Sequence, residues 1–389
     1  MKHAYNEVNL YNLAVIKESK RWSSQGLIEE DQLKNIEQEY PCSFYHPNII
    51  IRILLFIAAL FALSGVTGFF ALLFGNGGEK VLPLACLIYG VISFALLDRI
   101  LINQNRHYKS GVAECILYHA CGFAIVGLGW MADFNTYVVL ITCLLVFSYA
   151  AFRYLDLLTT MAAIGSFAGL LFYACYEADG IFQQVIPFVF ILCFGSVYVI
   201  TRKLKNHNHL KFWLLNMMIV EVISLLLVYA AGNYLVVREL SINLMNLELV
   251  EGQDIPFAFL FYALTIFIPL ALLYVGIKHK DVLALRVSLI AIAFTVFTFK
   301  YYYGFGHPEI TLTVAGALLF SIALLLSNYL KKMRGGFTRE NHLAEKWANL
   351  NLQAFIVSQT LGGNQSGAGK QTETGGGGQF GGGGSTDSF

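Results

Sequence analysis

The sequence has little charge. Only 13% of its 389 residues are Asp, Glu, Lys or Arg, against the roughly 25% that is usual in soluble domains. Proline is scarce as well, with seven residues, whereas 57% of the chain is hydrophobic and the mean hydropathy is +0.60. This composition excludes a disordered chain, a collagen-like chain and an ordinary water-soluble enzyme of this length. It predicts an all-α fold, a polytopic transmembrane helix bundle.

The sequence also lacks an excess of either charge and an ordered pattern of cysteines. The 26 Lys and Arg residues are balanced by 25 Asp and Glu, so no overall field favours a nucleic-acid partner. None of the seven cysteines stands in a C-x-x-C spacing, and all except Cys42 lie in apolar runs. We expect them to behave as small hydrophobic residues, without a disulfide framework or a metal site.

Long hydrophobic runs dominate the chain instead. A membrane-spanning helix needs about 20 mostly apolar residues, and ten runs meet or approach that length. They are residues 49–74, 81–97, 111–130, 136–152, 157–176, 181–201, 212–237, 256–277, 282–301 and 310–330. Because the second and fourth runs are shorter than the others, nine and eleven spans stay open as alternatives to ten.

The distribution of basic residues predicts how these spans are oriented, because Lys and Arg favour cytoplasmic loops. With the N-terminus placed inside, 23 of the 26 basic residues lie on the inner side, and only Lys80, Arg238 and Lys300 lie outside. The outer loops carry acidic residues instead. One miscounted span would invert every later loop, so the distribution favours an even number of spans with both termini cytoplasmic.

Three segments lie outside the predicted bundle of residues 49–330. Residues 1–48 are predicted to form a cytoplasmic helical hairpin, because apolar residues recur at helical spacing on both sides of Gly26. Residues 331–361 are predicted to form a cytoplasmic amphipathic helix at the membrane surface. Residues 362–389 are polar and rich in glycine. We expect this tail to be disordered, because it cannot bury enough apolar surface to fold.

The N-terminal segment also contains a recognisable motif. It is Trp22-x3-Gly26-Leu27-Ile28, followed by Gln32, Ile36 and Tyr40 and then directly by the spans. This pattern resembles a bacterial family of predicted multi-pass membrane proteins that is classed only as a domain of unknown function, most clearly over residues 12–70. The resemblance implies a bacterial inner-membrane location. It provides no catalytic residue, because the family has no assigned activity. The glycine-rich tail is similar in composition to the ends of various bacterial envelope proteins.

Glu221 is the first candidate functional residue, because ionisable groups inside a span are costly and commonly functional. It lies about ten residues into the seventh run, with Ser224 one helical turn later and Asn216 about one turn earlier. We expect its carboxyl group to be buried between helices, since exposing it to lipid would be unfavourable. Two interpretations stay open: a proton relay or cation site, and a neutral hydrogen bond that locks two helices together.

Glu114 and His119 in the third run are further candidates. Five residues separate them, which places them about 140° apart on a helix, so they do not form a pair on one face. For His119 a role in helix contacts is favoured over proton transfer. Arg153 and Asp156, at the turn after the fourth run, are predicted to pair with each other. No set of metal-ligating residues accompanies these candidates, so no metal site is predicted.

No G-x-S-x-G, Walker A or H-E-x-x-H motif occurs in the chain, so neither enzymatic activity nor a cofactor is predicted. The favoured function is that of a non-enzymatic envelope scaffold or regulatory protein. Its partners would be the lipid bilayer and other envelope proteins, which it would bind through the N-terminal hairpin or the C-terminal tail. The alternative is a secondary transporter built of two inverted five-helix halves that uses Glu221.

Reporter fusions test the predicted topology. Alkaline phosphatase fused after Gly78 or after Glu251 is expected to be active, because both positions are predicted to be external. The same enzyme fused after His207 is expected to be inactive, and a fluorescent protein fused there is expected to fluoresce, because that loop is predicted to be cytoplasmic. A reversed result at any of the three positions would contradict the assignment of the spans.

Overall fold

A computed structural model of the protein describes residues 2–75, 81–178, 181–205, 207–245 and 254–303, together with single positions between 313 and 328. Helices are the only extended regular elements within these ranges. Their bounds are α1 Glu7–Ser24, α2 Glu30–Glu39, α3 Ile49–Phe74, α4 Val81–Leu96, η1 Leu97–Gln104, α5 Val112–Met131, α6 Thr136–Tyr154, α7 Leu157–Glu177, α8 Ile181–Leu204, η2 Asn208–Trp213, α9 Leu214–Gly232, α10 Tyr234–Asn243, α11 Ala258–His279 and α12 Val282–Tyr303.

Nine helices in the described part of the chain are long and apolar enough to cross a membrane. This finding confirms the predicted all-α, multi-pass membrane-type fold. Helix α3 has the predicted bounds, while the second span is longer than predicted, because the π-helix η1 continues α4 to give a helix of 24 residues. The segments 331–361 and 362–389, and all but a few positions of the tenth predicted span, lie outside the described residues. The count of ten spans and the location of both termini stay predictions.

The seventh predicted span differs from the structure. A continuous helix over residues 212–237 was expected, but α9 ends at Gly232 and α10 begins at Tyr234. Asn233 adopts an extended conformation between them, and its side-chain oxygen accepts a hydrogen bond from the Val236 amide at 3.2 Å. This residue therefore ends one helix and caps the next. The prediction of one continuous helix is wrong because apolar residues hide a break that a single polar side chain produces.

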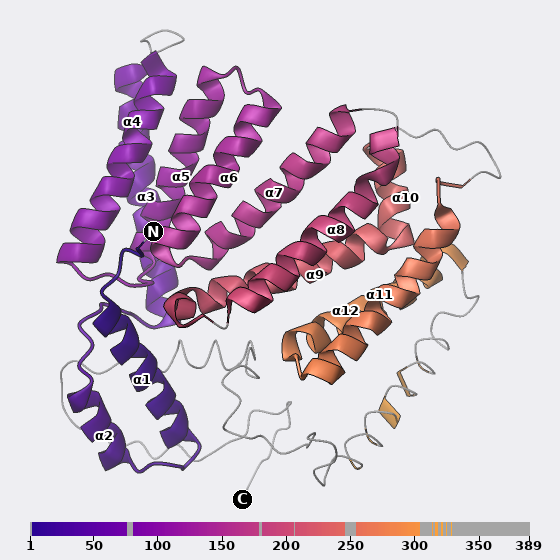
Figure 1. Cartoon of the computed structure of the whole chain (residues 1–389). Coiled ribbons are helices and arrows are strands. Elements are labelled where there is room, and N and C mark those ends of the chain that lie inside the picture. The colour runs from indigo at the N-terminus through magenta and orange to yellow at the C-terminus, as the bar shows by residue number, and fades with distance from the viewer. Residues whose placement is uncertain are drawn as a thin grey trace, which may run out of the picture.

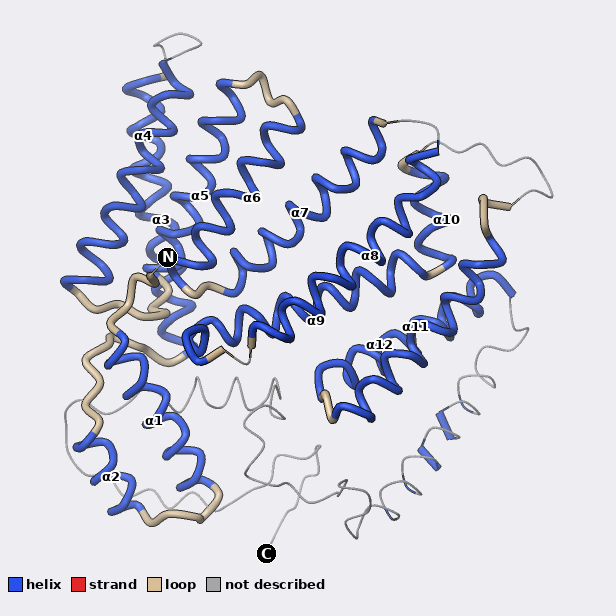
Figure 2. Tube along the Cα trace, viewed as in Figure 1, coloured by secondary structure: helices blue, strands red, loops and turns tan. Residues whose placement is uncertain are grey.

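The spanning helices form a row of antiparallel hairpins. Helices α4 and α5, α6 and α7, α8 and α9, and α11 and α12 pack along one another as pairs, and each pair contacts the next pair in the chain (Figure 1). Helix α3 lies against α5, and the short α10 lies against α9 and α11. The described loops between the hairpins are short (Figure 2). Neighbours in the sequence are therefore neighbours in space throughout the row.

Small residues allow the first hairpin to pack closely. A Cβ atom added to Gly90 of α4 would lie 2.8 Å from the backbone nitrogen of Ala124, and one added to Gly127 of α5 would lie 2.7 Å from that of Leu87. Both distances are shorter than van der Waals contact. Glycine is thus required where α4 and α5 cross, which is the common way for membrane helices to gain contact area in the absence of a hydrophobic driving force.

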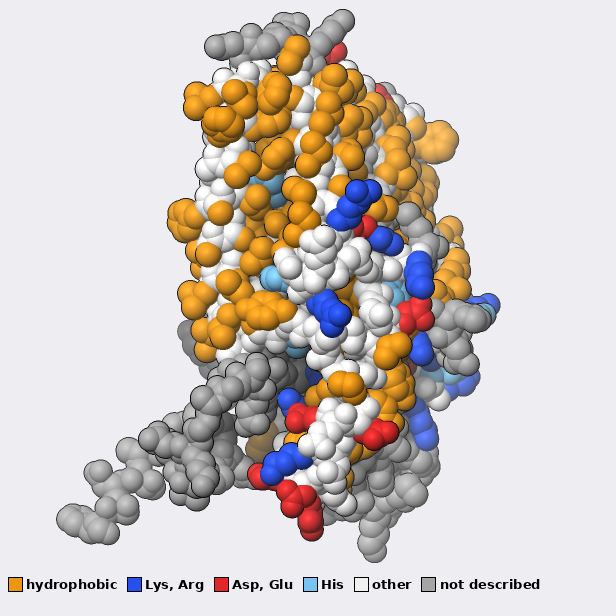
Figure 3. Space-filling model, turned by 90° about the vertical axis from the view of Figure 1, so that its left-hand side faces the viewer, with side chains coloured by type: hydrophobic (Ala, Val, Ile, Leu, Met, Phe, Trp, Pro, Cys, Tyr) orange, Lys and Arg blue, Asp and Glu red, His pale blue; other side chains and the backbone are white. Residues whose placement is uncertain are grey.

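The outer surface of the row is apolar. None of the 26 residues of α3 is buried, although the helix is among the most hydrophobic of the chain. Figure 3 shows one face of the molecule, on which hydrophobic side chains cover the upper part and charged side chains gather below, toward α1 and α2. An apolar exterior of this kind fits a hydrocarbon surrounding, because lipid rather than water then contacts these side chains.

Helices α1 and α2 stand outside the row and are joined to one side of it. Gly26, at φ +71°, turns the chain between them, and Lys20 forms an ion pair with Glu37 at 3.1 Å. The segment before α1 is anchored, because Tyr5 is buried in a cluster that contains Leu97 of η1 and Tyr154 of α6. The N-terminal helical pair is therefore fixed to the spans at its base, while most of its surface is exposed.

The segment after α2 forms a second anchor. The Tyr45 amide donates to the Arg106 carbonyl oxygen at 2.9 Å, and the Tyr108 amide donates to the Tyr45 carbonyl oxygen at 3.1 Å. The Nδ1 atom of His46 lies 3.3 Å from the Tyr108 carbonyl oxygen. Burial in this junction lowers the pKa of His46 from 6.5 to about 4, because removal from water disfavours the charged imidazolium.

This lowered pKa makes the junction sensitive to acid. The unfolded chain takes up a proton at His46 below about pH 6.5, whereas the folded protein does so only near pH 4, so stability is lost as the pH falls between these values. At pH 5 the expected loss of unfolding free energy is on the order of 2 kcal/mol. Thermal melting at pH 7.5 and pH 5 measures it. His46→Asn is expected to melt with a smaller pH dependence than the wild type, whereas the exposed-site control His279→Asn should match the wild type. Equal pH dependence in the His46→Asn variant and the wild type would contradict the assignment.

Candidate functional site

Charged side chains of the spans gather on one side of the row, where α3, α5 and α12 begin and α6 and α8 end, and we call this side the charged end. Four ion pairs lie there. They are Arg52–Glu114 at 2.6 Å, Arg153–Asp98 at 2.7 Å, Arg202–Asp281 at 3.1 Å and Lys205–Glu221 at 2.5 Å. Each pair joins residues from two different elements, so that α3 is tied to α5, α6 to η1, and α8 to both α9 and the turn before α12. The ion pairs therefore connect different helices rather than stabilise single helices.

Glu221 is the most buried acidic residue of this group. Its exposed fraction is 0%, as predicted, and one carboxylate oxygen, Oε2, accepts a hydrogen bond from Nζ of Lys205. Lys205 follows the last residue of α8, and 23% of its side chain is exposed. Its long aliphatic stem thus reaches from the water-facing end of α8 to a carboxylate about two turns into α9. The charge on Glu221 is compensated by a cation from the neighbouring helix.

A second group of charges lies beside this pair. Arg202 of α8 contacts Asp281, and the Tyr198 hydroxyl donates to the same Asp281 oxygen at 3.2 Å. The other Asp281 oxygen caps α12 by accepting hydrogen bonds from the amides of Leu283 and Ala284. The C-terminal end of α8 therefore supplies two cations, one to α9 and one to the first turn of α12.

Ser224 follows Glu221 by one turn on the same side of α9. Its side chain is also fully buried, and neither its hydroxyl nor the Glu221 Oε1 atom has a hydrogen-bond partner among the described residues. Two polar oxygens thus lie on one helix face, and the Glu221 carboxylate also contacts the Lys205 ammonium group. Chemically this arrangement is able to hold a proton.

Asn216 and Glu114 have different neighbours. The Asn216 amide donates to the Asp156 carbonyl oxygen at 2.9 Å and to the Thr160 hydroxyl at 2.6 Å, both of α7 or its cap. Glu114 pairs with Arg52 and also accepts from the Gly111 amide at 2.7 Å, which closes the first turn of α5. These contacts hold α9 to α7 and α5 to α3, and they occupy both side chains.

His119 lies deeper, between α3, α4 and α5. Its Nε2 atom is 3.2 Å from the Tyr89 hydroxyl and 3.3 Å from the Thr67 hydroxyl, and its ring contacts that of Phe123. No carboxylate or cation contacts it among the described residues. The arrangement fits a histidine that joins three helices through neutral hydrogen bonds.

The five candidate residues therefore do not form one site. Glu221 and Ser224 face the end of α8, Asn216 faces α7, Glu114 faces α3, and His119 lies between α3 and α4. The predicted pairing of Arg153 with Asp156 is also wrong. Arg153 pairs with Asp98, whereas Asp156 caps α7 by accepting from the Thr159 amide at 2.8 Å. The backbone amides in the first turn of α7 need a hydrogen-bond acceptor, and this need outweighs the proximity of Arg153 and Asp156 in the sequence.

Sequence reasoning missed the partners of Glu221 and Glu114. Lys205 and Arg52 were counted only as positive residues at the ends of spans. One signal was available in the sequence, because each of these basic residues lies within two turns of a helix end. A long basic side chain at such a position reaches an acidic residue of the next helix, as Lys205 does, or of the next but one, as Arg52 does.

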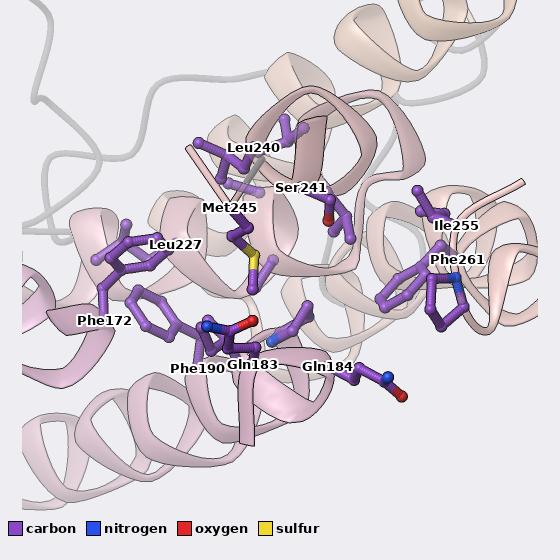
Figure 4. A pocket seen from close by; sticks show the side chains of 17 residues that line it. Phe172, Gln183, Gln184, Phe190, Leu227, Leu240, Ser241, Met245, Ile255 and Phe261 are labelled. Carbon is purple, nitrogen blue, oxygen red and sulfur yellow. The ribbon is translucent and has the colours of Figure 1, made fainter. Parts of the chain in front are cut away.

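An apolar pocket lies on the opposite side of the row, where α7 and α9 end and α8 begins. It has a volume of about 220 Å³ and is enclosed by α7, α8, α9, α10 and the segment that leads into α11. Figure 4 shows side chains from these elements around it, with Met245 after α10 pointing toward Gln183 and Phe190 of α8. No charged side chain lines it, and none of the five candidate residues does. The pocket and the charged end are thus separate features.

Within the described part of the chain, no group of three or more His, Cys, Asp or Glu residues is arranged to hold a metal ion. Comparison with known proteins gives no further assignment: no protein-family model, no curated protein and no solved structure matches the chain.

Substitutions of the Lys205–Glu221 pair test its role. Lys205→Met leaves the carboxylate buried without a counter-charge, which is expected to cost about 3 kcal/mol of unfolding free energy. The double variant Lys205→Met with Glu221→Gln removes both charges and is expected to recover most of this loss. Lys203→Met, at the neighbouring exposed lysine, serves as the control and should melt like the wild type. The assignment fails if the double variant is no more stable than Lys205→Met in detergent melting experiments.

Proposed function

We propose that this protein is a non-enzymatic scaffold or regulatory protein of the bacterial inner membrane, and that its N-terminal helical pair binds another envelope protein on the cytoplasmic side. The observation that carries the proposal is that α1 and α2 stand outside the spans, are anchored to them on both sides, and expose apolar side chains.

The anchoring is specific. The Ala4 amide donates to the Arg153 carbonyl oxygen at 2.8 Å, and the Arg153 guanidinium donates to the Lys2 carbonyl oxygen at 2.9 Å while it pairs with Asp98. His3 is buried, and its ring contacts those of Phe212 and Trp213, which precede α9. The contacts of these N-terminal residues therefore extend from η1 and α6 to the start of α9. A partner bound to α1 would be held at a fixed position relative to the spans.

One face of α1 is suited to a protein partner. Val8, Tyr11 and Trp22 lie within about 60° of one another around the helix, and their exposed fractions are 65%, 51% and 37%. Leu27, in the turn between α1 and α2, is 50% exposed. Exposed apolar and aromatic residues at helical spacing are typical of a helix that packs against a groove or another helix.

The charged residues of the spans support the same proposal. The ion pairs at the charged end use the acidic and basic side chains to hold helices together, and the pocket between α8 and α10 has no charged lining. A catalytic or transport site would instead place such groups around a polar cavity.

The alternative remains a secondary transporter of two inverted five-helix halves that uses Glu221. Its best support is the buried carboxylate with the Ser224 hydroxyl one turn away. The helix contacts weigh against this alternative. In two equivalent halves α3 and α4 would correspond to α8 and α9, so the two pairs should pack in the same way. Helices α8 and α9 pack along most of their length, whereas α3 packs mainly on α5. Under the transport hypothesis Glu221→Gln abolishes pH-dependent flux in proteoliposomes, and under the scaffold hypothesis it leaves partner binding unchanged.

Site-specific photo-crosslinking in native membranes tests the proposed partner surface. A photoreactive phenylalanine analogue at Tyr11 is expected to form a discrete adduct with another protein. Val8→Asp, one turn away and largely exposed, should reduce this adduct by about tenfold, because it places a charge in an apolar contact. Ser24→Asp, at an exposed position about 160° around α1 from Val8 and about 140° from Tyr11, should leave it unchanged. The proposal would be contradicted if the adduct persisted in the Val8→Asp variant, or if the only crosslinks formed were within the chain itself.

A further inference from the structure

The apolar pocket is created by the break between α9 and α10. Helix α9 ends at Gly232, and α10 turns away so that its residues form a wall of the pocket opposite α8. The Asn233 amide fixes this turn by donating to the hydroxyls of Tyr229 at 2.9 Å and Thr298 at 3.0 Å. These three side chains are buried and hydrogen-bonded to one another. The walls are therefore held in place by a satisfied polar network, independently of any ligand.

The pocket changes in character from floor to mouth. Its floor is apolar and buried, with Ile186, Val237 and Phe261 among the residues that form it. Its mouth is marked by the exposed lining residues Gln184 and Leu240. An apolar floor below a rim with an amide group complements an amphiphile, which has a hydrocarbon part and a polar part.

The chemistry of the lining excludes a charged or strongly polar occupant. No Asp, Glu, Lys, Arg or His side chain lines the pocket. The amide of Gln183, which faces the interior in Figure 4, already donates to the Tyr176 carbonyl oxygen at 3.0 Å. A polar ligand would lose its hydration in this pocket without gaining hydrogen bonds, which is unfavourable.

The size fits a hydrocarbon chain. The volume is about 220 Å³, and an apolar cavity of about 150 Å³ in another protein stays free of water and binds benzene. An empty space of this size also deprives its lining of dispersion contacts. A flexible chain of methylene groups restores those contacts at no cost in buried polar groups.

The position of the pocket identifies the source of that chain. Four of the helices around it, α7, α8, α9 and α11, are long and apolar enough to cross a membrane, so the pocket mouth lies at bilayer depth near one membrane surface. We propose that the pocket binds one acyl chain of a membrane phospholipid, with the headgroup beyond the rim at Gln184 and Leu240. This inference does not depend on the proposed partner surface of α1, which lies on the opposite side of the row.

Photolabelling of the full-length protein in vesicles tests the inference. The vesicles consist of phosphatidylethanolamine and phosphatidylglycerol, with a trace of phosphatidylglycerol that carries a diazirine at the end of one acyl chain. After irradiation, adducts are expected on pocket residues such as Met245 and Phe190. Ala231→Phe fills the floor and displaces two or more methylene groups, so it should reduce these adducts by about tenfold. Ala271→Phe, at an exposed position of α11, is the matched control and should label like the wild type.

Two further measurements keep the test decisive. If Ala231→Phe lowers the melting temperature, Ser241→Trp at the half-exposed wall of α10 replaces it, and the same loss of labelling is expected. A trace of palmitate that carries the same diazirine at its chain end, used in place of the labelled phosphatidylglycerol, should give about tenfold fewer pocket adducts. Unchanged labelling in a filled variant that folds, labelling of the pocket floor by a headgroup diazirine, or equal labelling by the palmitate probe would each overturn the proposal.

Discussion

The structure depends on one constraint, the cost of an uncompensated charge in hydrocarbon. The spans carry few ionisable side chains, and the acidic ones at the charged end are used in ion pairs or in helix caps. Each pair joins two elements, and the Arg153 guanidinium also holds the N-terminal segment by donating a hydrogen bond to the Lys2 carbonyl oxygen. A hydrophobic driving force between helices is absent in lipid. The ion pairs, the close approach of α4 to α5 and a few hydroxyl and amide contacts therefore determine which helices lie together.

The two sides of the row, formed by opposite ends of the helices, use polar groups differently. At the charged end, opposite charges neutralise one another close to water, where Lys and Arg keep part of their side chains exposed. At the other end, Asn233 and the hydroxyls of Tyr229 and Thr298 form a neutral, buried network that fixes the turn into α10. The first arrangement holds helices together, and the second shapes a hollow between them. This division explains why the buried acidic residue and the apolar pocket do not coincide.

The spans were predictable from the sequence because their signal is local. A run of about 20 apolar residues suffices, and the bounds of α3 follow from it directly. The break at Asn233 was not predictable in this way, because hydrophobicity all around a helix gives no periodicity to interrupt. The burial of Glu221 followed from the cost of exposing a carboxylate to lipid, but its partner Lys205 did not, since a long side chain at a helix end has several acids within reach. The separation of Asn216 from Glu221 depends on which neighbour each helix face meets, and that information is not contained in one helix.

The row of hairpins has a consequence for biosynthesis. Each hairpin contacts mainly the preceding and the following one, so a pair of helices that leaves the translocon meets a neighbour that is already in the bilayer. Assembly can then proceed in the order of synthesis, without waiting for a distant segment. The N-terminal anchor is the exception, because His3 contacts Phe212 and Trp213. His3 thus completes its contacts only after α8 has been made, and α1 reaches its final position late.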